Sequence, residues 1–154
     1  MDKLTTRALE GWSIAVALFG AGLCGAAFEA TDGFARFAFG ILGAEQAVFT
    51  PELRFAVALM GAVTLGWGLT AWAVARSTAA MSGPVAAATW RRVAAAVTVW
   101  FVIDSMLSIA TGFGLNAVSN SLIYAAFLLI LWRGSVLAPV ASPARPLSRE
   151  GGMG

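Results

Sequence analysis

The sequence contains no histidine and only one cysteine, Cys24. Histidine is the commonest metal ligand in proteins and the usual general base near neutral pH, so its absence argues against ordinary metal or acid–base chemistry. A single cysteine can form neither an internal disulfide nor a Cys-x-x-Cys site. We therefore expect no metal, no cofactor and no enzymatic activity.

Charged residues are also scarce. They make up 12% of the 154 residues, whereas 59% are apolar, and soluble domains average about 25% charged and about 45 to 50% apolar residues. The basic residues form no dense run that would follow a nucleic-acid backbone, so we expect no nucleic-acid partner. The long uncharged runs instead indicate a protein whose solvent is the lipid bilayer.

Four apolar stretches, at 11–28, 53–75, 93–111 and 115–132, each approach the roughly 20 residues that a helix needs to cross a bilayer. They lack the strict alternation of barrel strands, and only helices or closed barrels satisfy backbone polar groups in lipid. The sequence predicts an all-α membrane protein, with a bundle of four transmembrane helices over 1–138 and a disordered tail over 139–154. An alternative for the first stretch is a cleaved secretory signal, because Lys3 and Arg7 precede it.

The basic residues between these stretches predict an orientation, because cytoplasmic loops carry an excess of Lys and Arg. Only Arg36 and Arg54 lie in or beside the first connection, and the other basic residues lie at the N-terminus, in the second connection or at the C-terminal end. We expect both termini on the cytoplasmic side of an inner membrane. Four tryptophans fall at helix ends on that side, where this side chain favours the interface: Trp12, Trp72, Trp90 and Trp132.

The first connection, 29–52, contains an apolar segment at 34–44 in which Arg36 is the only charge. This segment is too short to span a membrane but suits a helix that lies in the interface or re-enters the bilayer. Its buried face is expected at Phe37, Phe39 and Ile41. A lid over the bundle is the simpler interpretation, and a substrate gate is the alternative.

Small residues recur at helical spacing in the first two stretches. They let the backbones of neighbouring helices approach closely, within one chain or between copies of it. The residues predicted to pack in this way are Ala17, Ala21, Gly25, Gly61 and Gly68.

Asp104 is the only acid inside a predicted span. Because a charged residue there costs about 2.5 to 3.5 kcal/mol on insertion scales, it should face protein and not lipid. The short connection near residue 114 predicts an antiparallel hairpin in which Asp104 lies opposite Tyr124 and Ser108 lies opposite Asn120. These side chains either carry a proton or serve only as hydrogen bonds between helices. The candidate polar site comprises Asp104, Ser105, Ser108, Asn116, Asn120 and Tyr124.

A wider pattern includes the same residues: Gly66-Trp67-Gly68, Trp100-Phe101, Asp104-Ser105, Ser108, Gly112, Asn116 and Asn120. Over about 34–132 the chain resembles a group of small, uncharacterised four-helix bacterial membrane proteins. No activity is assigned to that group. The resemblance implies a multipass protein of the bacterial inner membrane and implies no substrate.

Three functional hypotheses follow. The preferred one is a non-enzymatic accessory or scaffold protein, whose partners are the lipid bilayer and either further copies of itself or another membrane protein. The alternative is a proton-linked transporter or channel for a small solute, with Asp104 as the titrating group and Tyr124 and Asn120 as its neighbours. The third is a lipid or quinone binder that uses a pocket under the first connection.

Overall fold

The computed structural model describes residues 2–138, which are all-helical. Four of their helices are long and apolar enough to cross a membrane: α1 (Lys3–Cys24), α3 (Pro51–Ala79), α4 (Gly83–Ala110) and α5 (Gly114–Arg133). A shorter helix, α2 (Gly33–Ile41), and two single turns, η1 (Gly25–Ala27) and η2 (Glu29–Thr31), lie between α1 and α3. The prediction of four apolar helices is confirmed. The predicted tail at 139–154 lies outside the described residues.

α1 and α3 begin before the apolar stretches because polar side chains cap their N-terminal ends. At the start of α1, Asp2 Oδ1 accepts a hydrogen bond from the Thr5 backbone N–H at 2.6 Å. At the start of α3, the Thr50 hydroxyl accepts from the Leu53 N–H at 3.3 Å, and Pro51 occupies the first turn, where no N–H is needed. These caps satisfy backbone groups that an apolar pattern cannot reveal.

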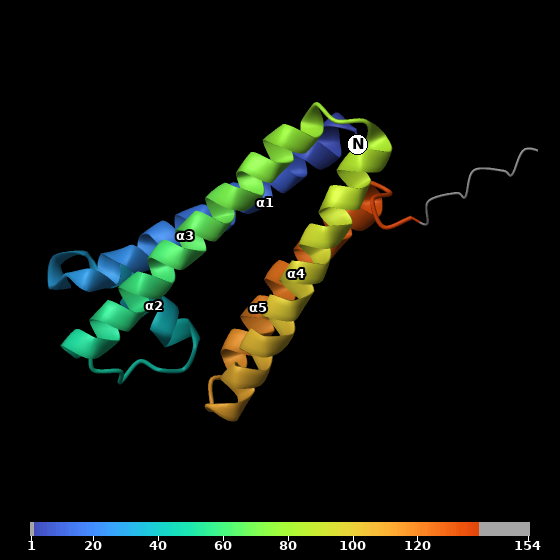
Figure 1. The fold of residues 1–154 in the computed structure, drawn as a ribbon. Helices are drawn as coiled ribbons and strands as arrows, with labels where there is room; N and C mark the ends of the chain where they lie inside the picture. The colour runs from blue at the N-terminus through green and yellow to red at the C-terminus, as the bar shows by residue number, and fades with distance from the viewer. Residues whose placement is uncertain (1, 139–154) are drawn as a thin grey trace, which may run out of the picture.

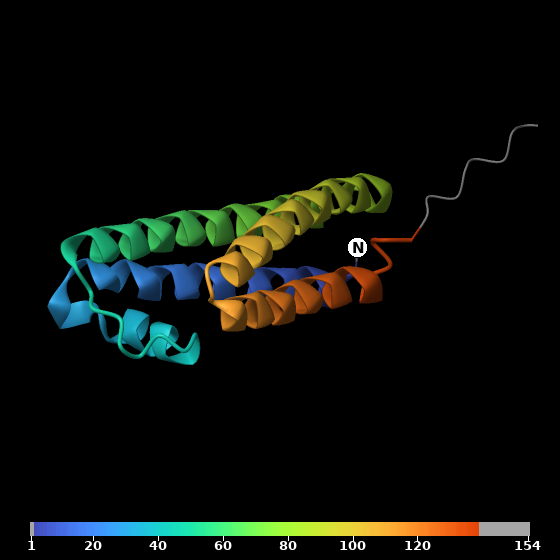
Figure 2. The same cartoon turned by 90° about the horizontal axis from the view of Figure 1, so that it is seen from below.

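The four long helices form two antiparallel pairs. α1 packs along most of α3, α4 packs along α5, and α3 contacts α4 only slightly. In Figure 1 the two pairs diverge from the end that holds the N-terminus, and α2 and the α4–α5 turn lie at the opposite end. Figure 2 shows α5 beside α1, which accounts for the contact between the pairs. We call the end that holds the N-terminus the terminal end, and the end that holds α2 and the α4–α5 turn the far end.

Glycines bring the backbones of α1 and α3 into direct contact. A Cβ added to Gly61 would lie 2.5 Å from Cys24 N, and one added to Gly68 would lie 2.5 Å from Ala17 N. Gly20 meets the backbone of α3 in the same way. Ala21 is exposed instead, because each four-residue step turns about 40° past a full circle and carries that position off the face that Ala17 and Gly20 share. Gly25 packs on the Thr31 carbonyl oxygen and not on a neighbouring long helix.

Aromatic side chains join the two pairs. Trp12 in α1 lies 5.5 Å from Trp67 in α3 and 4.8 Å from Phe127 in α5, measured between ring centroids. Trp90 in α4 is fully buried, and its Nε1 donates to Thr78 Oγ1 at 3.0 Å. Trp90 therefore does not expose its ring to lipid or water but fills the contact between the pairs, and its depth in a membrane stays a prediction.

Helix α2 packs through a different face from the predicted one. Ala35 is buried and Phe39 packs on Phe49, at 5.2 Å between ring centroids. Phe37 and Ile41 are exposed. Ala35 and Phe39 are four residues apart and share one face, whereas Phe37 lies nearly opposite on the helix. Phe39 therefore helps to anchor this helix as predicted, whereas Phe37 and Ile41 do not, and a re-entrant position for the helix stays a prediction.

Candidate functional site

The structure brings together three of the six predicted polar residues near the far end of the α4–α5 pair. Asn116, in the first turn of α5, donates through Nδ2 to Ser108 Oγ at 2.8 Å and to Asp104 Oδ1 at 3.3 Å. Ser108 Oγ donates to the Asp104 backbone carbonyl at 2.7 Å and lies 3.3 Å from its Oδ1. The Asn116 side chain thus ties α5 to the last two turns of α4.

Tyr124 does not reach this cluster. Its hydroxyl bonds Thr98 Oγ1 at 2.8 Å, and its ring stacks on Phe101 at 4.4 Å between centroids. Asp104 faces Asn116 where Tyr124 was expected, because α4 ends at Ala110 and α5 already begins at Gly114. The hairpin therefore folds before residue 114, and pairs counted from that residue are out of register.

Two further predicted residues lie on the same pair of helices without joining the cluster. Asn120 is 6% exposed, and its Nδ2 has no hydrogen-bond partner among the described residues. The buried Ser105 Oγ likewise has none within residues 2–138. An unpaired buried polar group costs about 1 to 3 kcal/mol, so this part of the hairpin is not optimised for stability alone.

The Asp104 carboxylate is used on one side only. Oδ1 takes both side-chain contacts, whereas no hydrogen bond to Oδ2 is present within residues 2–138. The residue is half-buried, and Ile103 and Leu107 beside it are 54% and 60% exposed. One carboxylate oxygen of this half-buried residue therefore has no hydrogen bond within residues 2–138, and its neighbours on α4 are exposed apolar side chains.

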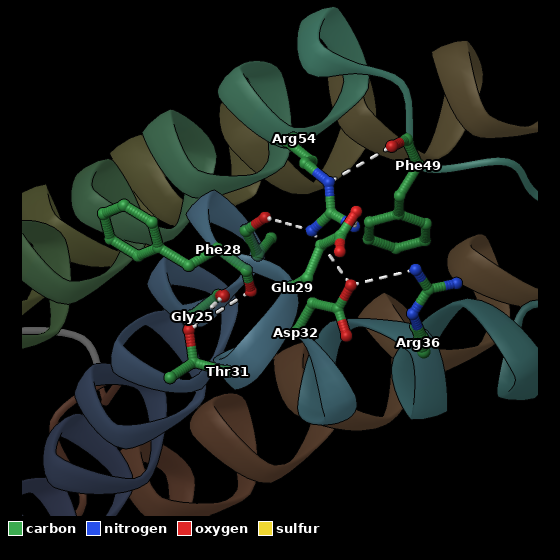
Figure 3. A network of polar contacts seen from close by, with 9 residues as sticks. Gly25, Phe28, Glu29, Thr31, Asp32, Arg36, Phe49 and Arg54 are labelled. Atoms are coloured by element: carbon green, nitrogen blue, oxygen red, sulfur yellow. Dashed lines mark hydrogen bonds and ion pairs between the residues drawn. The ribbon is translucent and has the colours of Figure 1, made fainter.

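A second polar network, which the sequence analysis missed, lies at the far end (Figure 3). The Arg54 side chain, in the first turn of α3, is 13% exposed and lies between Asp32 and Glu29. Its Nη1 is 2.9 Å from Asp32 Oδ2, and its Nη2 is 3.6 Å from Glu29 Oε1. It also donates to the carbonyl oxygens of Ala26 and Phe49, both at 3.2 Å. This one side chain connects η1, η2 and the segment after α2 to α3.

Arg36 completes the network from α2. Its Nη2 lies 2.9 Å from Asp32 Oδ2, and its guanidinium carbon stands 4.7 Å from the centroid of the Phe49 ring. The Arg36 guanidinium, followed by Arg54, holds the pKa of Asp32 below its usual value, and Asp32 in turn raises the pKa of Arg36. The carboxylate stays charged throughout the physiological range, so the network is a fixed clamp and not a switch.

Part of this network is visible in the sequence. Asp32 and Arg36 are four residues apart, which is the spacing of an ion pair on one helix face. Arg54 is the other basic residue of that region and therefore the natural partner for its acids. The contact between Arg54 and Asp32 joins residues on either side of α2 and the segment 42–50, and no local sequence pattern indicates it.

An open pocket of about 600 Å³ adjoins the network. Its lining includes Phe28 and Phe55, which are 70% and 69% exposed. The Arg54 donors that border it are already committed to protein oxygens. The pocket therefore offers apolar contact but no free cation, and we do not assign a ligand to it.

Comparison of the chain with models of protein families, with curated proteins and with solved structures gave no match. The fold itself, four helices long and apolar enough to cross a membrane, is consistent with a multipass membrane protein. Function must therefore be argued from the residues of this chain.

Proposed function

We propose that the chain is a multipass protein of a bacterial inner membrane that serves as a non-enzymatic accessory or scaffold protein. The α4–α5 pair would bind a transmembrane helix of another polypeptide. The open Asp104 Oδ2 carries this proposal, because a carboxylate at membrane depth is too costly to leave in contact with lipid. A hydrogen-bond donor from a partner helix would satisfy it.

The internal packing narrows the surface available to a partner. The small-residue faces of α1 and α3 are used against each other, at Gly20, Gly61 and Gly68. They are therefore not free to join copies of the chain, which the sequence alone had suggested. The exposed side of the α4–α5 pair is a remaining surface, and it carries Asp104, the acid of the predicted spans.

The test is assembly in native lipid. The full chain would be extracted with its surrounding lipid, and its complexes would be weighed by native mass spectrometry. Asp104→Asn keeps an oxygen for Asn116 but replaces Oδ2, so we expect on the order of threefold to tenfold weaker assembly, as for one interhelical hydrogen bond. Ser121→Ala is the control, because that exposed hydroxyl bonds only its own helix, at Ala117 O. A chain that is monomeric and without protein partners would contradict the proposal.

The same oxygen favours a second candidate, proton-linked transport of a small solute. Asp104 is the acid that this hypothesis requires, and one of its carboxylate oxygens has no hydrogen bond within residues 2–138. Proton movement across vesicles that contain the chain would be followed with a pH-sensitive dye. Movement that Asp104→Asn abolishes and Ser121→Ala preserves would favour transport over the scaffold function.

The orientation with both termini on the cytoplasmic side is also a proposal. Cysteine labelling tests it after Cys24→Ala removes the native thiol. Glu45→Cys at the far end should react with an impermeant reagent in intact cells, and Ala80→Cys at the terminal end should react only after permeabilisation, since both positions are exposed. The reverse pattern would overturn the orientation.

A further inference from the structure

A basic pocket lies at the terminal end, between the first turns of α1 and the last turns of α3. Its α1 residues recur at three- and four-residue spacing and so share one face of the helix. The pocket is open and measures about 310 Å³. Its lining consists of Lys3, Thr6, Arg7, Glu10, Arg76 and Ala79.

The charges in this pocket are unbalanced. Glu10 is its only acid and lies 3.4 Å from Arg76 Nη1, so that pair is internally compensated. Lys3 and Arg7 are exposed and form no ion pair within the described residues. Arg36 and Arg54 at the far end, by contrast, are both paired with acids. Two uncompensated cations beside a hydroxyl group therefore face one opening.

Apolar surface continues from the pocket along both helices. On α3, Trp72 and Leu69 lie four and seven residues before Arg76, on the same side of the helix, and are 40% and 51% exposed. On α1, Ile14 and Leu18 follow Arg7 and are 46% and 67% exposed. A molecule with an anionic head and apolar chains fits this arrangement of a basic pocket beside apolar surface. Its head would contact the cations while its chains lie along the helices.

We infer that this pocket binds the phosphate headgroup of an anionic phospholipid from the leaflet at the terminal end. Lys3 and Arg7 contribute the charge and the donors for the phosphate oxygens, because the Thr6 hydroxyl already donates to the Asp2 carbonyl oxygen at 3.2 Å. The inference rests on the membrane placement proposed above but not on the docking role of Asp104. The positive-inside rule only counts basic residues in each connection, whereas this inference assigns two of them to one lipid site.

Lipid retention measures this binding directly. The full chain would be placed in nanodiscs made from equal amounts of phosphatidylglycerol and phosphatidylcholine, and the lipids that remain bound would be identified by native mass spectrometry. We expect the chain to retain phosphatidylglycerol preferentially. Lys3→Gln combined with Arg7→Gln should reduce this preference by roughly 25-fold, since each basic residue near an anionic surface contributes a factor of roughly five.

Matched variants separate the pocket from general charge. Arg92→Gln combined with Arg133→Gln removes the same charge from exposed positions at the same end but outside the pocket, and it should leave the preference intact. Lys3→Arg combined with Arg7→Lys keeps both charges and should also retain it. An equal loss in the Arg92 and Arg133 variant would overturn the inference.

Added inorganic phosphate distinguishes the two sources of a phosphate group. If millimolar phosphate displaces the lipid, the pocket is a site for free phosphate and the lipid assignment is wrong. If the chain enters nanodiscs but retains both lipids equally, the lipid site is contradicted and the membrane placement is not. If the chain does not enter them, the membrane placement fails instead.

Discussion

Replacing Gly61 by alanine should separate α1 from α3. The added Cβ would lie 2.5 Å from Cys24 N and 2.7 Å from Gly20 O, and both are backbone atoms that cannot rotate away. Relief requires the helices to part locally by about 1 Å, and a gap of that size forfeits a quarter to a half of each dispersion contact along it. We expect a loss of about 1 to 3 kcal/mol in the free energy of unfolding, as for other overpacked sites.

Gly66 provides the matched control on the same helix, because a Cβ there would meet nothing within 4 Å. Gly66→Ala should be neutral or slightly stabilising, since alanine favours the helix. Both variants would be unfolded in detergent by titration with sodium dodecyl sulfate, with tryptophan fluorescence as the readout. If Gly61→Ala proves as stable as Gly66→Ala, the backbone contact between α1 and α3 does not hold the pair together, and the packing argument fails.

Two further outcomes are expected. Because Arg36 and then Arg54 lower the pKa of Asp32, its stabilising effect is complete above its ordinary value of 3.8 and is lost only as the pH falls through the lowered value. The melting temperature should therefore fall below about pH 4, and this fall should be smaller in the Asp32→Asn variant. If the melting temperature of the variant falls by the same amount, Asp32 is not the cause. Trp90→Phe removes a buried hydrogen bond to Thr78 and should cost about 1 to 3 kcal/mol. Trp132→Phe, at a position 68% exposed, should cost nothing measurable in the same thermal assay, and equal losses would refute the buried role of Trp90.

The number and character of the long helices could be predicted because both depend on length and hydropathy. The starts of the helices depend on local signals instead, and Thr50-Pro51-Glu52 and Ser82-Gly83-Pro84 indicate the starts that α3 and α4 have. α4 begins at Gly83, ten residues before the apolar stretch at 93–111, since its first turns need only a polar start and a proline near the first turn. A search for apolar runs detects the part of a helix that suits lipid and not the part that projects beyond it.

Three of the six residues of the candidate site could be predicted to lie together, but the geometry of the site could not. Asp104, Ser108 and Asn116 were expected to be near one another because each polar residue inside a span needs a partner. The pairing of Asp104 with Tyr124 required the position of the turn to within a residue or two. Helix boundaries are commonly predicted with an error of one or two residues. In an antiparallel hairpin, moving the centre of the turn by one residue moves the residue expected opposite a given position by two.

The far-end network was missed for a different reason. Its central contact joins Arg54 to Asp32 across α2 and the segment 42–50, so it depends on the path of the first connection. Helical periodicity indicates which residues share a face of one helix, but it does not place two connections side by side. The buried face of α2 was predicted incorrectly for the same reason. Phe37 has the larger side chain and was expected to be buried, but Ala35 is the buried residue.

The pairing of charges, more than their number, distinguishes the two ends of the molecule. At the far end, Asp32 lies 2.9 Å from both Arg36 and Arg54, so the basic residues there carry little free charge toward a membrane surface. At the terminal end, Lys3 and Arg7 remain uncompensated within the described residues. An anionic leaflet attracts only uncompensated cations, so it favours the terminal end more strongly than a count of basic residues indicates. The ion pairs that fix the first connection to α3 thereby also increase the asymmetry on which a cytoplasmic position for the termini depends.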